Sequence, residues 1–103
     1  MLFHTSEKYF SEVLEESQQR LVLVDFYASW CAPCRILEPE LDAFSEKYSN
    51  QISAYSVNID TDLKLAEFYK IKNLPTVIIF KNNQPMQRWE KEISVAEIEK
   101  AIN

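Results

Sequence analysis

Glycine is absent from this chain of 103 residues, whereas average usage would supply about seven. A turn that needs a positive φ must therefore use another residue, and asparagine tolerates that backbone best among the alternatives. We expect such turns at Asn73 and at the Asn82–Asn83 pair.

Cysteine and histidine, which often bind transition metals, are scarce. The chain has only Cys31, Cys34 and one histidine, His4, which lies in a separate segment. Two thiolates leave a tetrahedral zinc ion two ligands short, so we predict no metal site within one chain. A zinc ion shared between two chains is the remaining metal alternative, and we expect His4 at the surface or at a strand edge.

Long apolar runs and an excess of positive charge are also missing. No apolar stretch approaches about 18 residues, so no segment is predicted to span a membrane. The net charge of −5 argues against nucleic acid or an anionic membrane as a partner. Residues 1–7 lack the basic n-region of a secretory signal, and we therefore expect a cytoplasmic protein.

Apolar residues are abundant enough for a core. They make up 47% of the chain, and no repeat, low-complexity tract or linker interrupts it. We therefore predict a single domain over residues 1–103.

The spacing of apolar residues predicts alternating helices and strands. The near-continuous apolar run over residues 21–27 is typical of a strand buried on both faces. The Asp60–Asp62 segment and Ser94 are expected to cap the helices that follow them. These patterns predict an α/β fold with helices on both faces of a sheet. Its helices cover residues 6–17, 32–48, 63–69 and 94–102, and its strands cover residues 21–27, 52–59, 76–80 and 86–90.

Both cysteines belong to the motif Cys31-Ala32-Pro33-Cys34, which lies between a predicted strand and a predicted helix. The first turn of a helix brings two thiols at this spacing together, and its unpaired N–H groups favour a thiolate over a thiol. Pro33 suits that turn because its missing N–H would have no partner there. The motif predicts a redox-active dithiol; two buried, inert cysteines or one structural disulfide are the alternatives.

Four segments of the chain resemble the thioredoxin family. They are LVDFYASWCAPCR (residues 23–35), VNID (57–60), LPT (74–76) and FKN (80–82), in the order and with the spacing of that family. The resemblance covers essentially the whole chain. It implies a thioredoxin fold, with a central mixed β-sheet of four to five strands flanked by four helices. It also implies a monomeric thiol–disulfide oxidoreductase that reduces protein disulfides and binds no cofactor.

The resemblance implies a catalytic cycle for the two cysteines. Cys31 attacks a substrate disulfide as a thiolate, and Cys34 then resolves the mixed disulfide, which leaves a Cys31–Cys34 disulfide. A flavoprotein thioredoxin reductase that draws on NADPH would restore the dithiol. Arg35 is expected to add positive potential near the attacking sulfur.

Asp25 is the third predicted catalytic residue. It lies within an apolar run, so burial should raise its pKa. The resemblance implies that its carboxylate takes the proton from Cys34. Many thioredoxins have a lysine at the position of Ser56, and without that lysine Asp25 should be easier to protonate. The alternative is a core aspartate satisfied by the backbone or by water.

Six residues around the cysteines are implied to bind the substrate: Trp30, Ala32, Pro33, Leu74, Pro75 and Lys91. The resemblance makes Pro75 a cis-proline beside the cysteines and leaves the backbone of Leu74 to pair with an extended substrate segment. Trp30 is expected to shield the disulfide; its alternative role is that of a partly buried aromatic that contributes packing.

Three residues depart from the family pattern. Ala32, Asn73 and Lys91 stand where the family usually has glycine. A lysine at position 91 either obstructs the backbone of a partner or selects among partners. A specialised protein with few clients is therefore one alternative to a reductase of broad range. A non-catalytic binding module that merely keeps the fold is the other.

Overall fold

The computed structural model describes all 103 residues and contains one five-stranded sheet and four α-helices. None of the helices is long and apolar enough to cross a lipid bilayer. In chain order the elements are β1 (Leu2–His4), the 3₁₀ helix η1 (Glu7–Tyr9), α1 (Phe10–Glu16), β2 (Leu21–Tyr27), α2 (Ala32–Lys47), β3 (Ile52–Asn58), α3 (Leu63–Phe68), β4 (Thr76–Lys81), β5 (Gln84–Glu90) and α4 (Val95–Ile102).

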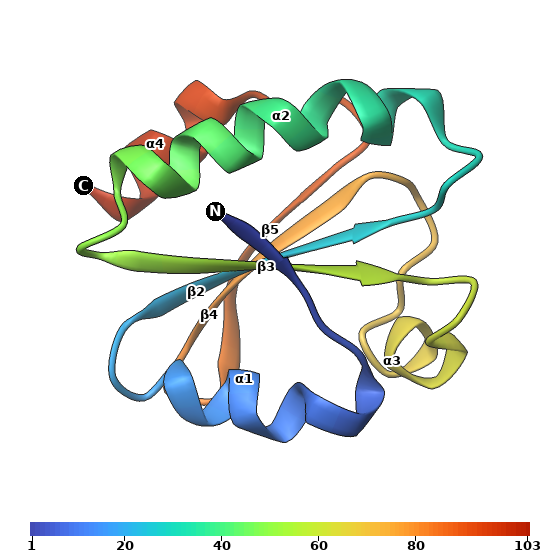
Figure 1. Cartoon of the computed structure of the whole chain (residues 1–103), viewed down its shortest axis with the longest axis horizontal. Helices are drawn as coiled ribbons and strands as arrows, with labels where there is room; N and C mark the ends of the chain where they lie inside the picture. Colours follow the sequence, from blue (N-terminus) through green and yellow to red (C-terminus); the bar gives the residue numbers. More distant parts are fainter.

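The strands lie in the order β1-β3-β2-β4-β5 (Figure 1). β1, β3 and β2 are parallel, whereas β4 runs antiparallel to both β2 and β5. The central strand β2 is buried along its whole interior, as its apolar run predicts. The predicted α/β class with a mixed sheet is confirmed.

Two helices cover each face of the sheet, with α2 and α4 above it and α1 and α3 below it in Figure 1. Successive residues of a strand point to opposite faces, so β2 and β4 each contribute to both halves of the core. Val24 and Phe80 pack on the α1 side, whereas Leu23 and Ile79 pack on the α2 side. This double packing holds β2 firmly and so positions the segment that follows it.

The short strand β1 is not among the strands that the apolar pattern predicts. It has three residues, and both Phe3 and His4 are exposed. Parallel pairing with β3 holds it, together with a hydrogen bond from the Leu2 N–H to Asp42 Oδ1 (2.8 Å), 40 residues away. Because these partners are distant in the sequence, local periodicity does not reveal this strand. His4 lies in this edge strand, as expected.

The two predicted helix caps do not form. Asp62 and Ser94 occupy the N-cap positions of α3 and α4, but neither side chain makes a capping hydrogen bond. Asp62 Oδ1 instead accepts a hydrogen bond from the Glu7 N–H of η1 (3.1 Å). At α3 a tertiary contact therefore replaces the local cap.

Four residues have a positive φ. Asn82 (52°) and Asn83 (69°) form the turn between β4 and β5, which confirms that part of the prediction. Asn73 does not have a positive φ; its side chain instead donates a hydrogen bond to a glutamate at the end of β5. The other two are Lys70 (54°) and Lys91 (67°), so lysine also takes a left-handed backbone in this chain.

Candidate active site

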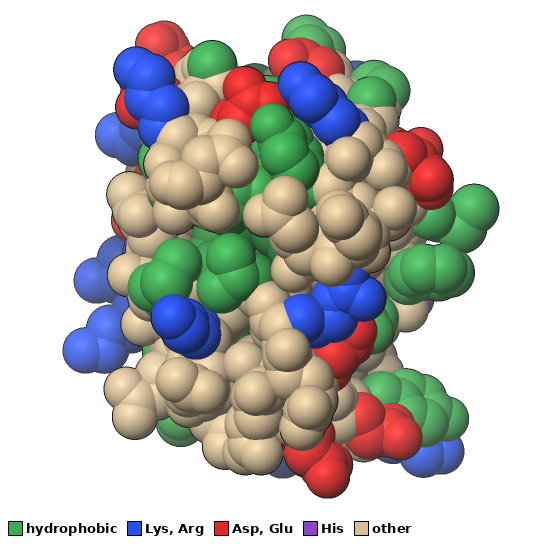
Figure 2. Space-filling model, turned by 90° about the vertical axis from the view of Figure 1, so that its left-hand side faces the viewer, with side chains coloured by type: hydrophobic (Ala, Val, Ile, Leu, Met, Phe, Trp, Pro, Cys, Tyr) green, Lys and Arg blue, Asp and Glu red, His purple; other side chains and the backbone are tan.

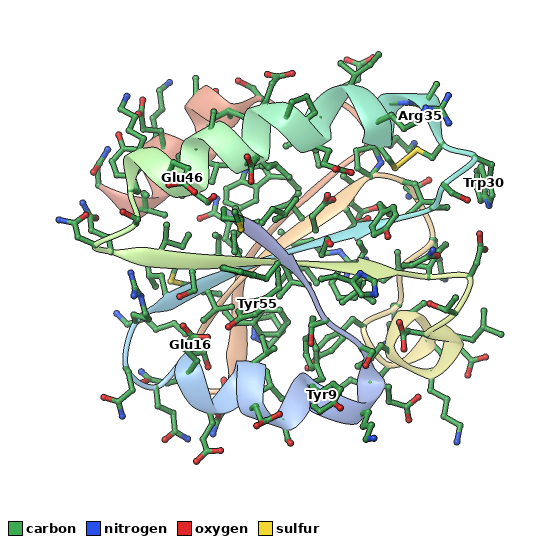
Figure 3. The ribbon with its side chains drawn as sticks, viewed as in Figure 1. Tyr9, Glu16, Trp30, Arg35, Glu46 and Tyr55 are labelled. Carbon is green, nitrogen blue, oxygen red and sulfur yellow. A yellow bond between two sulfur atoms is a disulfide. The ribbon has the colours of Figure 1, made fainter.

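The two cysteines meet where β2 ends and α2 begins. Cys31 is the N-cap residue of α2, and Cys34 lies in the first turn of that helix. Their Cα atoms are 5.3 Å apart and their sulfurs form a disulfide. Figure 3 shows this disulfide at the start of α2, near Trp30 and Arg35. The structure thus places the pair at the strand-to-helix junction that the sequence predicts.

The N-terminus of α2 stabilises negative charge on the Cys31 sulfur. The N–H of Cys34 donates a hydrogen bond to the Sγ of Cys31 (3.3 Å). Pro33, in the first turn, has no N–H that would need a partner there. Because the helix dipole also presents its positive end at this point, the Cys31 thiolate is favoured when the pair is reduced.

The two cysteines differ little in exposure, which is 5% for Cys31 and 2% for Cys34. They differ in access, because Cys31 lines a surface cavity of about 470 Å³ and Cys34 does not. We call this the active-site cavity. It is lined by Trp30, Cys31, Ala32, Pro33, Ile59, Ile71, Lys72, Asn73 and Leu74.

Trp30 is 66% exposed, so it is not the partly buried packing residue of the alternative interpretation. Its indole N–H donates a hydrogen bond to Asp60 Oδ2 (2.9 Å), which orients the ring at the rim of the active-site cavity. Arg35 lies in the first turns of α2, near the disulfide (Figure 3), and its guanidinium donates to the Ser29 carbonyl (2.7 Å). Both side chains are held by hydrogen bonds to the loops beside the cysteines.

Leu74 presents free backbone groups to the active-site cavity. Neither its N–H nor its C=O makes a hydrogen bond within the chain. The Leu74–Pro75 peptide bond is cis, and Pro75 itself is buried. The carbonyl of Pro75 is occupied, because it accepts a hydrogen bond from the Lys91 N–H (2.9 Å).

A second cavity, of about 220 Å³, lies on the other side of Pro33. Lys91 and Pro75 line it together with residues of α2. The six predicted substrate-binding residues are therefore all found around two cavities that share Pro33.

Asp25 lies in the middle of β2 and is only 1% exposed. Its Oδ1 has no hydrogen-bond partner, which argues against a core aspartate satisfied by the protein. Burial is the main cause that raises its pKa to about 7, and the negative charge of Glu38 adds to the shift. This is the direction that its apolar neighbours in the sequence predict. Ser56 is its partner in β3, so no cation lies at that position.

Sequence reasoning missed several residues of the site. Ile59, Ile71 and Lys72 line the active-site cavity, and Glu38 acts on Asp25. Ile59 could have been predicted, because β2 and β3 run parallel and parallel strands end at the same edge of a sheet, here the edge beside Cys31. No group of three or more His, Cys, Asp or Glu side chains is arranged to hold a metal ion.

A disulfide between residues three apart, at a helix N-terminus and open to a cavity on one side, defines a class of protein. This arrangement is typical of thiol–disulfide oxidoreductases. The thioredoxin family model matches residues 1–103. The chain therefore belongs to the thioredoxin family, which confirms the resemblance seen in its motifs.

Known relatives are similar over most of this chain. Thioredoxin 1 of Synechococcus elongatus is 42% identical over 80 residues, which are 78% of this chain and 73% of that protein. Thioredoxin Y, chloroplastic, of Oryza sativa is 44% identical over 81 residues, 79% of this chain and 48% of the rice protein. A bifunctional thioredoxin reductase/thioredoxin of Mycobacterium leprae is 34% identical over 84 residues, 82% of this chain and 18% of that protein. The chain thus spans about half the length of the rice relative and less of the mycobacterial one.

Proposed function

We propose that this protein is a protein disulfide reductase whose Cys31–Cys34 pair alternates between a dithiol and a disulfide. The observation that carries the proposal is the position of Cys31, which caps α2 and lines the active-site cavity. A sulfur at this position meets a substrate disulfide from the cavity side, and the helix N-terminus favours its reactive thiolate.

The reaction proceeds by two displacements. The Cys31 thiolate attacks one sulfur of the substrate disulfide, forms a mixed disulfide and displaces the other sulfur as a thiolate. The Cys34 thiolate then attacks the Cys31 sulfur, displaces the remaining substrate thiolate and forms the Cys31–Cys34 disulfide. The substrate gains two electrons and two protons, which the protein loses.

Asp25 acts in the second displacement as the acceptor of the Cys34 proton. A base works best when its pKa lies near the operating pH, and the pKa of Asp25, raised to about 7, meets that condition. The neutral carboxyl that results suits its buried position better than a carboxylate does.

The substrate lies against the free backbone of Leu74 as an added strand. Trp30, Ala32 and Pro33 form the wall on the cysteine side of the active-site cavity. Pro75 and Lys91 border the substrate in the smaller cavity, on the other side of Pro33.

A flavoprotein thioredoxin reductase, itself reduced by NADPH, returns the disulfide to the dithiol. The name of the mycobacterial relative supports this pairing, since it joins a thioredoxin reductase and a thioredoxin in one protein. We also propose that the protein is cytoplasmic and monomeric. Sedimentation velocity and fractionation of cells test these two points.

The test of the proposed function is NADPH consumption with a thioredoxin reductase and a protein disulfide substrate. We expect turnover with the parent and none with Cys31→Ser or Cys34→Ser. The two variants differ in a second readout, because only Cys34→Ser retains the attacking sulfur. It should accumulate a mixed disulfide with the substrate, whereas Cys31→Ser should not.

Other outcomes discriminate the alternatives. If no reductase supports turnover but dithiothreitol drives reduction that depends on Cys31, the interpretation as a specialised protein with few clients is favoured. If neither route reduces a disulfide, the protein is a non-catalytic binding module and the proposal is wrong. The intact cysteine pair at the end of the active-site cavity does not favour that module.

A further inference from the structure

A third cavity continues from the active-site cavity along α3. It measures about 410 Å³ and shares Ile59, Ile71 and Lys72 with the active-site cavity. We call it the α3 cavity; its other lining residues are Leu63, Ala66, Glu67 and Lys70. Because the two cavities have a common wall, a chain bound at the disulfide can run from one into the other along the surface.

The C-terminus of α3 shapes this common wall. Lys70 follows the helix with a φ of 54°. Its N–H donates to the Glu67 carbonyl (3.1 Å), and the Ile71 N–H donates to the Ala66 carbonyl (2.8 Å). These two bonds make a Schellman motif, which folds the residue after the left-handed position back against the helix. Ile71 and Ala66 thus become neighbours in the α3 cavity, and a lysine stands on each side of Ile71.

Hydrogen bonds from β5 hold the turn that carries Lys70 and Lys72. The Arg88 guanidinium donates hydrogen bonds to the carbonyls of Tyr69 and Lys70, the latter at 2.7 Å. Arg88 also pairs with Glu90 (3.0 Å), and Glu90 accepts a hydrogen bond from Asn73 (2.8 Å). Both ends of the turn are therefore tied to the same strand, and the lysines project from a fixed backbone.

Lys70 and Lys72 have no ion-pair partner within the chain. Both are exposed, and neither takes part in any of its four salt bridges. Glu67 is the only acidic residue that lines the α3 cavity. In a protein with a net charge of −5, two unpaired cations at the wall shared with the active-site cavity favour an acidic partner.

The α3 cavity also offers apolar contact. Leu63 is 63% exposed, whereas the two buried positions of α3 are occupied by Leu65 and Ala66. Together with Ile59 and Ile71, Leu63 forms the apolar part of the wall of the α3 cavity. An apolar side chain of a partner would cover this surface, and the hydrophobic effect favours that contact.

We propose that the α3 cavity selects disulfide-bearing client segments that have an apolar residue and an acidic residue close to the reacting cysteine. The apolar side chain packs against Leu63 and Ile71, and the acidic side chain meets Lys70 and Lys72. The inference rests on the proposed reductase function, since the client is the substrate of the Cys31–Cys34 pair. It assigns to the α3 cavity a role in choosing clients.

Short synthetic peptides with one cysteine test this preference. The cysteine is linked as a mixed disulfide to thionitrobenzoate, so attack by Cys31 on the peptide sulfur releases a coloured thiolate and Cys34 then releases the peptide thiol. One peptide carries Leu and Asp near the cysteine, a second replaces Asp by Lys, and a third replaces Leu by Ser. Each is made with these residues before or after the cysteine. Ellman's disulfide, which has no peptide, is the reference substrate.

We expect the reduced parent to react about fivefold faster with the Leu–Asp peptide than with the matched Leu–Lys peptide. This preference should hold either for the peptides with these residues before the cysteine or for those with them after it. The double variant Lys70→Glu, Lys72→Glu should reverse this preference, and about 1 M salt should abolish it because charges are then screened beyond about 3 Å. Leu63→Ser should slow the Leu peptides about threefold and leave the Ser peptide unchanged.

Two residues of α3 outside both cavities provide matched controls. Lys64→Glu makes the same charge change as each of the two lysine substitutions, and Phe68→Ser removes an apolar side chain that is 74% exposed. Neither should alter the order of the peptides. Leu63→Ser and the two controls should reduce Ellman's disulfide at the rate of the parent, since these residues do not line the active-site cavity. For Lys70→Glu, Lys72→Glu the readout is the ratio of two peptide rates within the variant, because Lys72 lines that cavity and Ellman's disulfide is itself an anion.

The outcomes separate this inference from the proposed function. If Ellman's disulfide is reduced and all peptides react equally, the inference is wrong and the reductase function stands. If neither Ellman's disulfide nor any peptide is reduced, the reductase function itself fails. If Leu63→Ser converts a dimer into a monomer in sedimentation velocity, a second copy of this chain occupies the cavity and the inference is overturned.

Discussion

Asp25 makes the stability of the fold depend on pH. In the folded protein its pKa is raised to about 7, whereas the unfolded chain has a value of about 3.9. Between these values the folded state binds more protons than the unfolded state, so stability falls as the pH rises. The stability that comes from the proton held by Asp25 in the folded state is fully present below about pH 4 and is lost as the pH passes about 7.

We therefore predict that Asp25→Asn stabilises the protein at pH 8. A shift of about three pKa units corresponds to about 4 kcal/mol, which is the upper limit of the expected gain in unfolding free energy. The gain should shrink towards zero near pH 4, where the parent carboxyl is already neutral. Urea denaturation at both pH values measures it. An NMR titration that places Asp25 near 3.9 would contradict the prediction.

Lys91 holds a backbone conformation that glycine adopts more readily. Its φ is 67°, and a residue with a Cβ loses roughly 1 kcal/mol in this region. We predict that Lys91→Gly raises the free energy of unfolding by about 1 kcal/mol. Lys81→Gly is the control, because Lys81 lies in β4 without a positive φ and its replacement should destabilise the protein.

The same variant tests whether Lys91 selects partners. The reduction rates of several protein disulfides should rise unequally in Lys91→Gly, since the side chain lies at the smaller cavity beside Pro33. Equal rates for parent and variant on every substrate would show that Lys91 has no part in client choice.

At the scale of elements, regular segments were predictable, whereas contacts between segments distant in the sequence were not. The apolar run of β2 and the helical spacing of α2 identify both elements because these patterns are local. β1 escaped prediction because its pairing with β3 is distant in the sequence. The cap expected from Asp62 failed for the same reason, since the η1 backbone competes for its carboxylate.

Side-chain hydrogen bonds join α1 to β3. Glu16, at the end of α1, accepts hydrogen bonds from the hydroxyls of Ser53 and Tyr55, and Figure 3 shows Glu16 and Tyr55 pointing toward one another. Burial is the main cause that raises the pKa of Tyr55 to about 12, and the bond to Glu16 adds to it. These contacts tie one helix to the side of the sheet formed by β1 and β3.

We predict that Tyr55→Phe lowers the free energy of unfolding by about 1 kcal/mol, because Glu16 loses one donor. Tyr9→Phe is the matched control, since the Tyr9 hydroxyl makes no hydrogen bond with another side chain and the residue is 51% exposed. Urea denaturation of both variants provides the measurement. Equal stability of the two would show that the bond between α1 and β3 contributes nothing.

At the scale of the whole molecule, the two ends of the sheet differ. The carboxyl end of β2 carries the disulfide and the exposed Trp30 (Figure 3). The active-site cavity and the α3 cavity adjoin them. The opposite end, which faces the viewer in Figure 2, shows separate groups of hydrophobic side chains among polar and charged ones. Client binding is therefore expected at the end that carries the disulfide.

The two halves of the core should unfold together because β4 serves both. Ile79 and Phe80 are neighbours, fully buried on opposite faces of the sheet. We predict that Ile79→Ala and Phe80→Ala each cost about 2–5 kcal/mol and that each variant keeps a single unfolding transition. Met86→Ala, at an exposed position in β5, should change stability by no more than about 0.5 kcal/mol. Circular dichroism and tryptophan fluorescence that give separate midpoints would contradict the prediction.

The sequence by itself determined the α/β class, the cysteine pair at a strand-to-helix junction and the buried Asp25. Apolar spacing and motif order are local properties, and they are sufficient for these three features. Only the tertiary structure decided that Ile59, Ile71 and Lys72 join two cavities beside Cys31, because these residues come from separate segments that the parallel sheet and the end of α3 bring together. The left-handed backbone of Lys70 also became visible only there, since lysine, unlike asparagine, gives no local sign of a positive φ.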